Sequence, residues 1–453
     1  MSKYIDNSTQ YSLRFHYDEE LFNNRWASEL DPTSLVLLNS GVMVESPEIA
    51  SMIAGGSNYF TIPFYKDIEG DEVNYDGKTD IPADDNEDGA QSGVVYGRAK
   101  GWKAQIFVND FTGADPMGNI LARINKWKGK KVQSRVIGIL NAILGIEADG
   151  EFADWNNHKM DISATSGTPA EANKIGLTTL RDVCVQALGD NADKFDFAIM
   201  HSKVANDLSK FNVLEYFKYN DARGQELDVK VGRNGNLIVL ICDEVPVEVS
   251  VQTAGVYTIK IDTAGVAGDT IKVFNETYSF VASGATGNQI NIGSSKNDQA
   301  NSLKALLSAK TGPEVDYTFT VATDTITATL KNSVTKKAVV PSVSTTGTVG
   351  ATLKTTTQPV YGNKYTTYIL GRGTLLRAPA PVEKPSDVDY KPAEKGGTEY
   401  LYTRYREAIH PNGFTFSMAN LPISPADSDL ENTANWKIVM NPKNIAIARL
   451  ICN

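Results

Sequence analysis

The apolar side chains of residues 115–147 recur at the spacing of one helical face. These positions are Ile120, Ile124, Trp127, Val132, Val136, Ile139 and Ile143. A single helix of this length is longer than most globular helices and would extend about 45 Å. Asp115 suits the N-cap and Pro116 the first helical position. We expect any bend in this helix to fall near Gly129 or Gly138.

Two strand-like segments precede this helix and enclose an acidic stretch. Residues 59–65, YFTIPFY, are rich in aromatic and β-branched side chains, and residues 94–108, VVYGRAKGWKAQIFV, are again typical of a strand. Residues 67–88 between them contain ten Asp or Glu and only one Lys. The pattern predicts a long β-ribbon over residues 58–110 with an acidic tip.

A mixed pattern of helices and strands follows the long helix. Residues 171–189 have helical periodicity, and residues 194–202 are typical of a strand whose last residue, Ser202, could cap the next helix. Asn234-Gly235 predicts a tight turn before a buried strand.

Residues 249–357 differ in composition from their surroundings. They are rich in Thr, Ser, Val, Gly and Ala and contain no Trp, Cys, His, Met or Arg. The patterns predict a hairpin over 268–282, an amphipathic helix over 297–309 and a second hairpin over 317–330. The apolar pairs expected in the second hairpin are Tyr317, Phe319 and Val321 facing Ile326, Ala328 and Leu330. We predict an inserted β-rich domain, because strand-like and charged sequence similar to that before residue 249 resumes at residue 364.

Composition and charge narrow the class of protein. The chain has 453 residues, 41% of them hydrophobic and 22% charged, as expected for a globular protein of two or three domains. A formal net charge of −10 argues against a dedicated nucleic-acid reader. No apolar stretch approaches the ~20 residues that a membrane span requires. Cys184, Cys242 and Cys452 form no CxxC motif and indicate buried thiols in a reducing compartment.

The sequence DDNEDG at residues 84–89 resembles the start of a calcium loop. An EF-hand loop needs a bidentate carboxylate at its twelfth position, and that position here is Val95. No helical pattern flanks the stretch. We therefore interpret it as a solvated, self-repelling loop tip.

The remaining polar residues point to no catalytic site. His16, His158, His201 and His410 form no HxH or HxxxH pair, and the chain has no G-x-S-x-G, Walker A or G-x-G-x-x-G motif. We interpret His201 as a helix-start or packing residue. RYRE (404–407) and KGKK (128–131), the basic clusters, are interpreted as surface charge or contacts with neighbouring subunits. We predict no enzyme activity and no catalytic, cofactor-binding or metal-binding residue.

The order of these parts resembles the major capsid proteins of tailed bacteriophages, which have the Hong Kong 97-type fold. The resemblance lies in the joint order and spacing of several segments and covers most of residues 20–246 and 364–453. These segments are IPFYKDIEGDEVNYDG (62–77), GWKAQIFVNDFTGADPM (101–117), FDFAIMHS (195–202), YTTYILGRGTLL (365–376), REAIHPNGFTF (406–416) and NWKIVMNPKNIAI (435–447).

The resemblance implies an α+β Hong Kong 97-type capsid fold with an added domain. It divides the chain into an N-terminal arm (1–57), an extended β-ribbon loop (58–110), a peripheral domain with the spine helix (111–170), an axial domain (171–248), an inserted β-rich, Ig-like or similar surface domain (249–357), an axial return with a Pro-rich loop (358–397) and a peripheral return (398–453).

The resemblance also implies a function in the virion. The chain would assemble with copies of itself, in hexamers and pentamers, into the icosahedral shell around the phage genome. A separate scaffolding protein is expected, because only 57 residues precede the loop and they carry no heptad pattern. A portal would be a further partner, packaged double-stranded DNA would be touched weakly, and no membrane would be involved. Assembly would take place in the bacterial cytoplasm, followed by shell expansion.

Two other classes stay open from sequence alone. An encapsulin-type compartment shell shares this fold, although the inserted module argues against it. The β-rich insert is also typical of phage adhesins and tail proteins, although no repeat runs through this chain.

Overall fold

The chain forms two compact units that are each assembled from separate segments. The computed structural model describes residues 40–453 apart from 67–71, 77, 79–86, 109–115, 212–214, 218–230, 235–236 and 294. The first unit contains the described residues up to Met160, together with Leu177–Val245 and Thr367–Leu450. The second unit contains Asp161–Gly176, Pro246–Thr366 and Ile451–Asn453. Most of the expected N-terminal arm, 1–57, lies outside the described residues.

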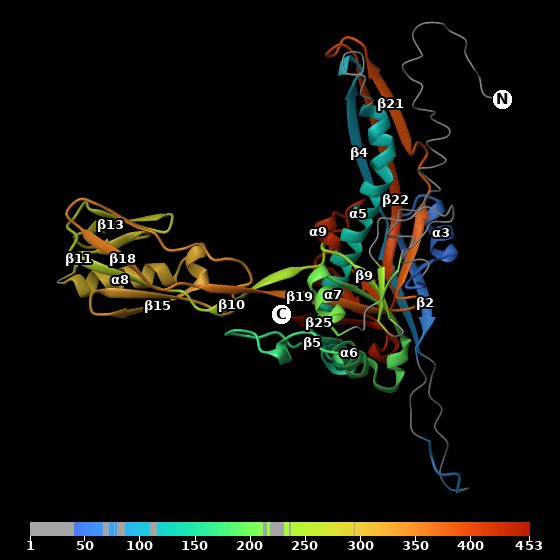
Figure 1. Cartoon of the computed structure of the whole chain (residues 1–453), viewed down its shortest axis with the longest axis horizontal. Coiled ribbons are helices and arrows are strands. Elements are labelled where there is room, and N and C mark those ends of the chain that lie inside the picture. Colours follow the sequence, from blue (N-terminus) through green and yellow to red (C-terminus); the bar gives the residue numbers. More distant parts are fainter. Residues whose placement is uncertain are drawn as a thin grey trace. The chain divides into compact units, whose positions relative to one another are not determined.

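A long helix and a five-stranded sheet dominate the first unit. The helix α5 (Pro116–Leu144) runs beside β4 and β22, as Figure 1 shows. The strand order is β1-β20-β22-β21, with β4 pairing along β22 as well. The strands are β1 (Met43–Glu45), β4 (Tyr96–Gln105), β20 (Leu375–Ala380), β21 (Ser386–Lys391) and β22 (Thr398–Pro411).

The predicted long helix is confirmed. It begins at Pro116, as expected, and continues through Gly129 and Gly138 to Leu144. Asp115, the expected N-cap, lies outside the described residues. The periodic apolar positions in its C-terminal half are buried in the main core of this unit, including Val132, Val136, Ile139 and Ile143. This burial is what holds the helix against the sheet.

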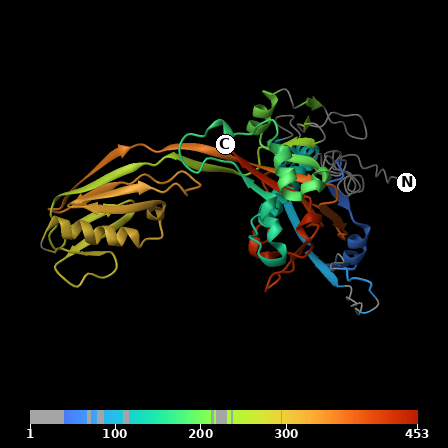
Figure 2. The same cartoon turned by 90° about the horizontal axis from the view of Figure 1, so that it is seen from below.

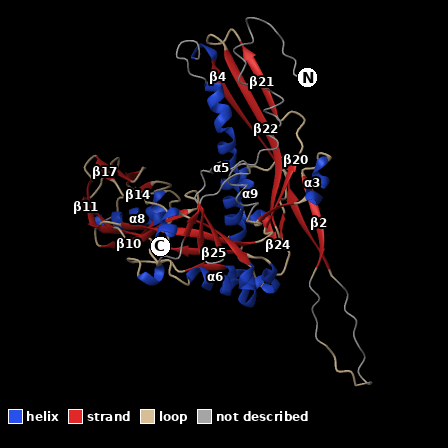
Figure 3. Cartoon of the chain, turned by 45° about the vertical axis from the view of Figure 1, so that its right-hand side comes forward, coloured by secondary structure: helices blue, strands red, loops and turns tan. Residues whose placement is uncertain are grey.

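The predicted β-ribbon is present with a different second arm. β2 (Tyr59–Tyr65) pairs antiparallel with β3 (Asp88–Val94), from Tyr59 opposite Val94 to Tyr65 opposite Asp88. Figure 3 shows this hairpin extending from the first unit. Residues 96–105, expected to form the returning arm, are instead β4, which pairs with β22 over ten residues. The expected returning arm was wrong, because β4 pairs with β22, some 300 residues later in the chain, and not with β2.

A second, eight-stranded sheet has the order β5-β25-β19-β6-β9-β8-β7, with β10 also paired to β19. The strands are β5 (Lys159–Asp161), β6 (Phe195–Met200), β7 (Glu215–Phe217), β8 (Val231–Asn234), β9 (Leu237–Ile241), β10 (Val247–Thr253), β19 (Val360–Gly371) and β25 (Ile447–Cys452). β6 and β9 are parallel, and the strand predicted after Asn234-Gly235 is β9, in which Val239 and Leu240 are buried. β8 pairs antiparallel with it, with Asn234 opposite Leu237, and Gly235 lies outside the described residues.

The helices of the first unit are shorter than the pattern suggested. The helix expected over 171–189 comprises only α6 (Thr179–Leu188), and residues 171–173 form a single 3-10 turn, η3 (Glu171–Asn173), that belongs to the second unit. The expected cap Ser202 is the first residue of α7 (Ser202–Ser209), and His201 is its N-cap. The other short helices are α3 (Pro47–Ala54), η2 (Gly150–His158), α9 (Asp427–Leu430), η4 (Gly189–Lys194), η6 (Thr433–Asn435) and η7 (Pro442–Asn444). The short strands β23 (Phe414–Phe416) and β24 (Trp436–Ile438) pair antiparallel.

The described part of the second unit contains two four-stranded sheets, the α-helix α8 (Lys296–Ser308) and the short 3-10 helix η5 (Pro313–Asp316). The strand orders of the sheets are β15-β16-β11-β18 and β14-β13-β12-β17. The helix α8 lies along the strands, as Figure 2 shows, and buries Ala300, Leu303 and Leu307. The strands are β11 (Val256–Thr263), β12 (Thr270–Val273), β13 (Glu276–Val281), β14 (Gln289–Asn291), β15 (Tyr317–Ala322), β16 (Thr325–Leu330), β17 (Val343–Thr346) and β18 (Gly350–Thr357).

The predicted elements of this unit are confirmed. Both hairpins and the helix are present, and the register of the second hairpin is the expected one. Tyr317 lies opposite Leu330, as expected from the alternation of apolar positions. The alternating apolar side chains of both sheets form one buried core with those of α8.

Candidate functional site

The β2–β3 hairpin presents aromatic side chains to solvent. Tyr65, at the far end of β2, is 76% exposed, and Tyr75, in the segment between the strands, is 90% exposed. Lys66 Nζ lies 2.8 Å from Glu87 Oε2 across the end of the hairpin. Large exposed aromatic side chains on a projecting hairpin are typical of a surface that contacts another protein.

The DDNEDG stretch is divided between the tip and a strand. Asp84, Asp85 and Asn86 lie outside the described residues, whereas Asp88 and Gly89 belong to β3. A Cβ at Gly89 would lie 2.7 Å from Cζ of Phe64, which is directly opposite on β2. Glycine at position 89 is therefore explained by close packing against Phe64, and not by the sharp turn that a calcium loop would need. Within the described ranges, no three His, Cys, Asp or Glu side chains are grouped so that they could hold a metal ion.

The base of the hairpin is packed against a buried histidine. The rings of Phe60 and His410 meet edge to face at 5.5 Å, and Trp436 lies 6.1 Å from His410 on another side. A Cβ at Gly93 would lie 2.3 Å from Cζ of Phe60 and 2.8 Å from Nδ1 of His410. Burial lowers the pKa of His410 to about 4, so its ring is neutral at physiological pH.

A buried charge cluster joins α5 to the five-stranded sheet. Arg135 Nη1 on α5 lies 3.4 Å from Glu407 Oε1 on β22, and Arg377 Nη2 on β20 lies 3.3 Å from Glu407 Oε2. The Tyr96 hydroxyl on β4 donates to Glu407 Oε1 at 3.1 Å. Arg135 Nε donates to Asp427 Oδ1 on α9 at 3.0 Å. The cluster thus fixes one orientation of the helix on three strands, since buried charges need these partners.

The Tyr96 hydroxyl and the Asp427 carboxyl of this cluster have shifted pKa values. Burial, followed by the Glu407 charge, raises the pKa of Tyr96 well above its ordinary value, so its hydroxyl stays a hydrogen-bond donor. Burial would raise the pKa of Asp427, but hydrogen bonds from Arg135 and Arg98 outweigh it and hold that pKa below its usual value.

The two basic clusters of the sequence contain buried residues as well as surface residues. In RYRE, Glu407 is 2% exposed and belongs to the buried charge cluster, whereas Arg406 Nη2 donates to the backbone oxygen of Ser57 at 3.0 Å. In KGKK, Lys128 is 8% exposed, and its ammonium lies 5.3 Å from the centre of the Tyr405 ring. Interpreting these residues as solvent-facing was therefore wrong for Glu407 and Lys128. Short charged motifs give no signal of such partners, which lie far away in sequence.

The histidines and cysteines are placed as structural residues. His201 Nδ1 accepts a hydrogen bond from the Lys203 backbone N–H at 3.0 Å, which confirms its interpretation as a helix-start residue. His158 is buried, its pKa is lowered to about 4 by burial, and its Nδ1 lies 2.8 Å from the Ile447 carbonyl oxygen. The three cysteines are buried thiols outside any disulfide, as expected, and burial raises the pKa of Cys184 to about 12. His16 lies outside the described residues.

A pocket of about 530 Å³ opens in the first unit between β19 and η7. Its lining includes Arg372, whose Nε lies 2.8 Å from Asp196 Oδ2, together with Thr374, Asn412 and Asn444. This pocket could not be predicted from the sequence, because its lining comes from four separate segments. Among the helices that the structure describes, none is long and apolar enough to cross a membrane.

Comparison with known proteins gives one relative in sequence. No protein-family model matches the chain. The chain is 23% identical over 251 residues to the major capsid protein of Bacillus phage SPP1, an alignment that covers 55% of this chain and 72% of that protein. Among solved structures, it is similar to the capsid asymmetric unit of cyanophage Pam1 (TM-score 0.39, 9% identity, 88% of this chain and 85% of that chain). It is also similar to the capsid of Ralstonia phage GP4 (TM-score 0.42, 8% identity, covering 91% of this chain and 87% of that chain).

The sequence relative agrees with the family resemblance drawn from the order of segments. Neither depends on a catalytic motif, and the described residues include no metal-binding cluster. By its sequence, the chain is related to a phage major capsid protein.

Proposed function

We propose that this protein assembles with copies of itself into the icosahedral head shell that encloses a phage genome. The similarity to the major capsid protein of Bacillus phage SPP1 carries the proposal. The fold would be of the Hong Kong 97 type, with α5 as the spine helix of the peripheral domain. The role is structural, without enzymatic activity.

The β2–β3 hairpin is the element we assign to contacts between subunits. Its Tyr65 and Tyr75 support this assignment, because both offer large side chains that are mostly exposed in the described chain. Each subunit would repeat such a contact around hexamers and pentamers. Many modest contacts in a closed shell sum to high stability, even where each is individually weak.

The remaining segments would take the roles that the resemblance implies. Residues 171–248 and 358–397 would form the axial domain and its return, and residues 398–453 the peripheral return. The β-rich residues 249–357 would lie on the outer surface of the shell. Scaffolding protein and portal would be partners, with assembly in the bacterial cytoplasm and expansion during maturation. The net charge of −10 supports weak, non-specific contact with packaged DNA.

Electron microscopy after expression with and without the phage's scaffolding protein tests this proposal. We expect closed, uniform shells only in the presence of the scaffold. The double variant Tyr65→Ser/Tyr75→Ser should fold with unchanged circular dichroism and fail to form shells. Val339→Ser is the matched control, since it removes an apolar side chain that is 51% exposed in the second unit. A chain that stays monomeric with its scaffold present would refute the proposal.

A further inference from the structure

Exposed lysine and arginine side chains follow one side of α5. The helix contains six cationic residues and no Asp or Glu, in a chain whose formal net charge is −10. Two of the six are buried: Lys128 packs against Tyr405, and Arg135 belongs to the buried charge cluster. The other four are exposed, at Arg123, Lys126, Lys130 and Lys131. The acidic net charge of the chain therefore coexists with a local surplus of positive charge on this helix.

The strand β4 extends this charge beyond the helix. It contains three cationic residues and, like α5, no acidic residue. The rings of Trp102 on β4 and Trp127 on α5 meet edge to face at 5.3 Å, so side chains of β4 that share the face of Trp102 point towards α5. Lys100 is exposed and lies on that face, two residues before Trp102. The name basic strip is used below for Lys100, Arg123, Lys126, Lys130 and Lys131.

The surroundings of the basic strip are polar throughout. Helical spacing places exposed polar residues along the same side of α5, at Asn119, Arg123, Lys130, Ser134 and Asn141. Among the described residues of α5, no large apolar side chain is exposed. No ion pair between described residues involves Arg123, Lys130 or Lys131. These cations are therefore free to pair with an anion outside the chain.

A linear array of phosphates matches this surface. Arg123, Lys126 and Lys130 follow one another at intervals of about one helical turn, over about 10 Å of the helix axis. Double-stranded DNA carries one negative charge per about 1.7 Å of its axis, and Lys, Arg, Asn and Ser side chains commonly contact its phosphates. We propose that the basic strip contacts the phosphate backbone of the packaged DNA without reading its sequence. The inference rests on the proposed function, which puts a genome inside the shell, and it assigns the DNA contact to one surface.

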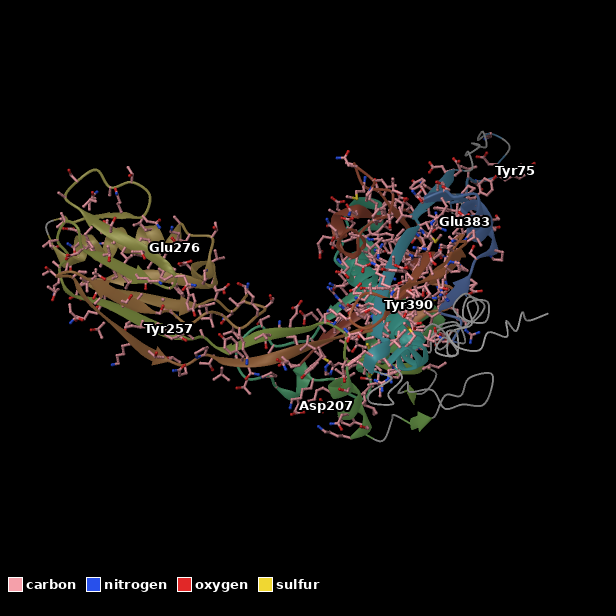
Figure 4. The ribbon with its side chains drawn as sticks, turned by 90° about the horizontal axis from the view of Figure 1, so that it is seen from above. Tyr75, Asp207, Tyr257, Glu276, Glu383 and Tyr390 are labelled. Atoms are coloured by element: carbon pink, nitrogen blue, oxygen red, sulfur yellow. The ribbon has the colours of Figure 1, made fainter. Side chains whose placement is uncertain are left out.

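The acidic β2–β3 hairpin of a second copy fits the basic strip less well. Figure 4 shows the side chain of Tyr75 on the segment between the two strands of the hairpin, where Tyr75 is 90% and Val73 is 39% exposed. Such side chains gain most from apolar surface, because the centres of protein interfaces are depleted of charged residues. The described residues of the strip offer no apolar surface of this kind. DNA phosphates need only cations and hydrogen-bond donors, so the chemistry of the strip favours DNA.

DNA binding by the purified, unassembled full-length chain tests the proposal. Fluorescent duplexes of about 30 base pairs and of two unrelated sequences are titrated at about 50 and 200 mM NaCl. Five cations on phosphates predict a slope of about −4 for the logarithm of the binding constant against that of the salt concentration, so affinity should fall by more than about 100-fold between these conditions. The two sequences should bind equally.

The variant of the strip is Arg123→Gln/Lys126→Gln/Lys130→Gln/Lys131→Gln, which keeps good helix formers on α5. We expect it to bind DNA at least about tenfold more weakly than the wild type at 50 mM NaCl, with a slope near −1. The matched control removes the same charge from exposed positions of the second unit, in Lys272→Gln/Lys336→Gln/Lys337→Gln/Lys354→Gln. The control should bind DNA as the wild type does, and circular dichroism checks the folding of both variants.

Chemical acetylation of the wild-type chain gives a second measurement that needs no variant. Bound DNA should protect Lys130 and Lys131 from acetylation and leave Lys336 and Lys337 of the second unit reactive. Mass spectrometry reads the modified positions. This measurement decides the question if the variant of the strip does not fold, since unprotected Lys130 and Lys131 in the DNA complex would overturn the proposal.

Three results of the binding experiment would also overturn it. The first is a wild-type chain that does not bind DNA at 50 mM NaCl. The second is an equal loss of affinity in the variant of the strip and in the control. The third is a variant that binds DNA as the wild type does and no longer forms shells with the scaffold, which would assign the strip to contacts between copies. Wild-type shells without DNA binding refute this inference alone, whereas a chain that never assembles refutes the proposed function.

Discussion

Arg135 and Glu407 meet at 3.4 Å although each side chain is only 3% exposed. The pair joins the middle of α5 to the longest strand of the five-stranded sheet. Arg377 and Tyr96 contact the same carboxylate from β20 and β4. A buried ion pair of this kind adds little net stability compared with an apolar pair. An arrangement that separates the two side chains is unfavourable, however, because it leaves a buried charge without its partner.

Arg135→Leu should therefore destabilise the first unit. The change removes a cation from Glu407 and Asp427 and leaves a buried carboxylate with fewer partners, so we expect a loss of about 3–5 kcal/mol in the free energy of unfolding. Urea denaturation followed by circular dichroism measures it. Arg181→Leu is the control. Its ion-pair partner is Asp193, and the two side chains are 59% and 84% exposed, respectively, so this pair should contribute less than about 1 kcal/mol to stability. Equal effects of the two changes would contradict the role of the cluster.

Acid should destabilise the fold through its two buried histidines. The pKa of His158 and that of His410 are each about 4 in the folded chain and near the ordinary value of about 6.5 when unfolded. As the pH falls from about 6.5 to 4, the unfolded chain binds protons first. Stability is therefore complete above pH 6.5 and falls by roughly 3 kcal/mol per histidine towards pH 4.

His410→Phe separates this contribution from that of the carboxylates. Phenylalanine keeps a ring between Phe60 and Trp436 and removes the titrating group. The difference between wild type and variant in the free energy of unfolding, measured between pH 7 and 4.5, should show a smaller acid loss in the variant. His158→Gln/His410→Phe should show a still smaller loss. Parallel pH profiles for all three proteins would exclude the histidines as the cause.

A side chain at Gly93 should disrupt the base of the hairpin. In Gly93→Ala the new Cβ would overlap Phe60 and crowd His410, so we expect a destabilisation of about 1–3 kcal/mol. Gly55→Ala is the matched control at the end of α3, where a Cβ would meet nothing within 4 Å and φ is −75°. Thermal unfolding compares them. A Gly93→Ala protein as stable as Gly55→Ala would show that the hairpin base tolerates movement.

The β-rich residues between β10 and β19 should be removable. Thr253 lies opposite Val360 in the antiparallel pair, so the ends of the excised segment are neighbours. Replacing residues 254–359 with a short Gly-Ser turn should leave a chain that folds and forms shells in electron micrographs. Leu303→Ala in the full-length chain removes buried apolar atoms from the core of the same unit. We expect this change to lower the free energy of unfolding of that unit by about 2–5 kcal/mol. Aggregation of the shortened chain would show that the first unit needs the insert.

Local patterns predicted the elements well where burial alternates regularly. The hairpin of Tyr317 and Leu330 and the helix from Pro116 follow from apolar spacing alone. The pairing of β4 with β22 and the burial of Glu407 depend on partners about 300 residues away, for which the sequence holds no local signal.

The order in which strands enter the sheets has a consequence for biosynthesis. β25 lies between β5 and β19, so its sheet stays incomplete until residue 452 has been made. The core of the second unit, by contrast, draws on residues 251–361 alone. That core can condense while the ribosome is still translating, whereas β4 and β5 lack their sheet partners until β22 and β25 emerge.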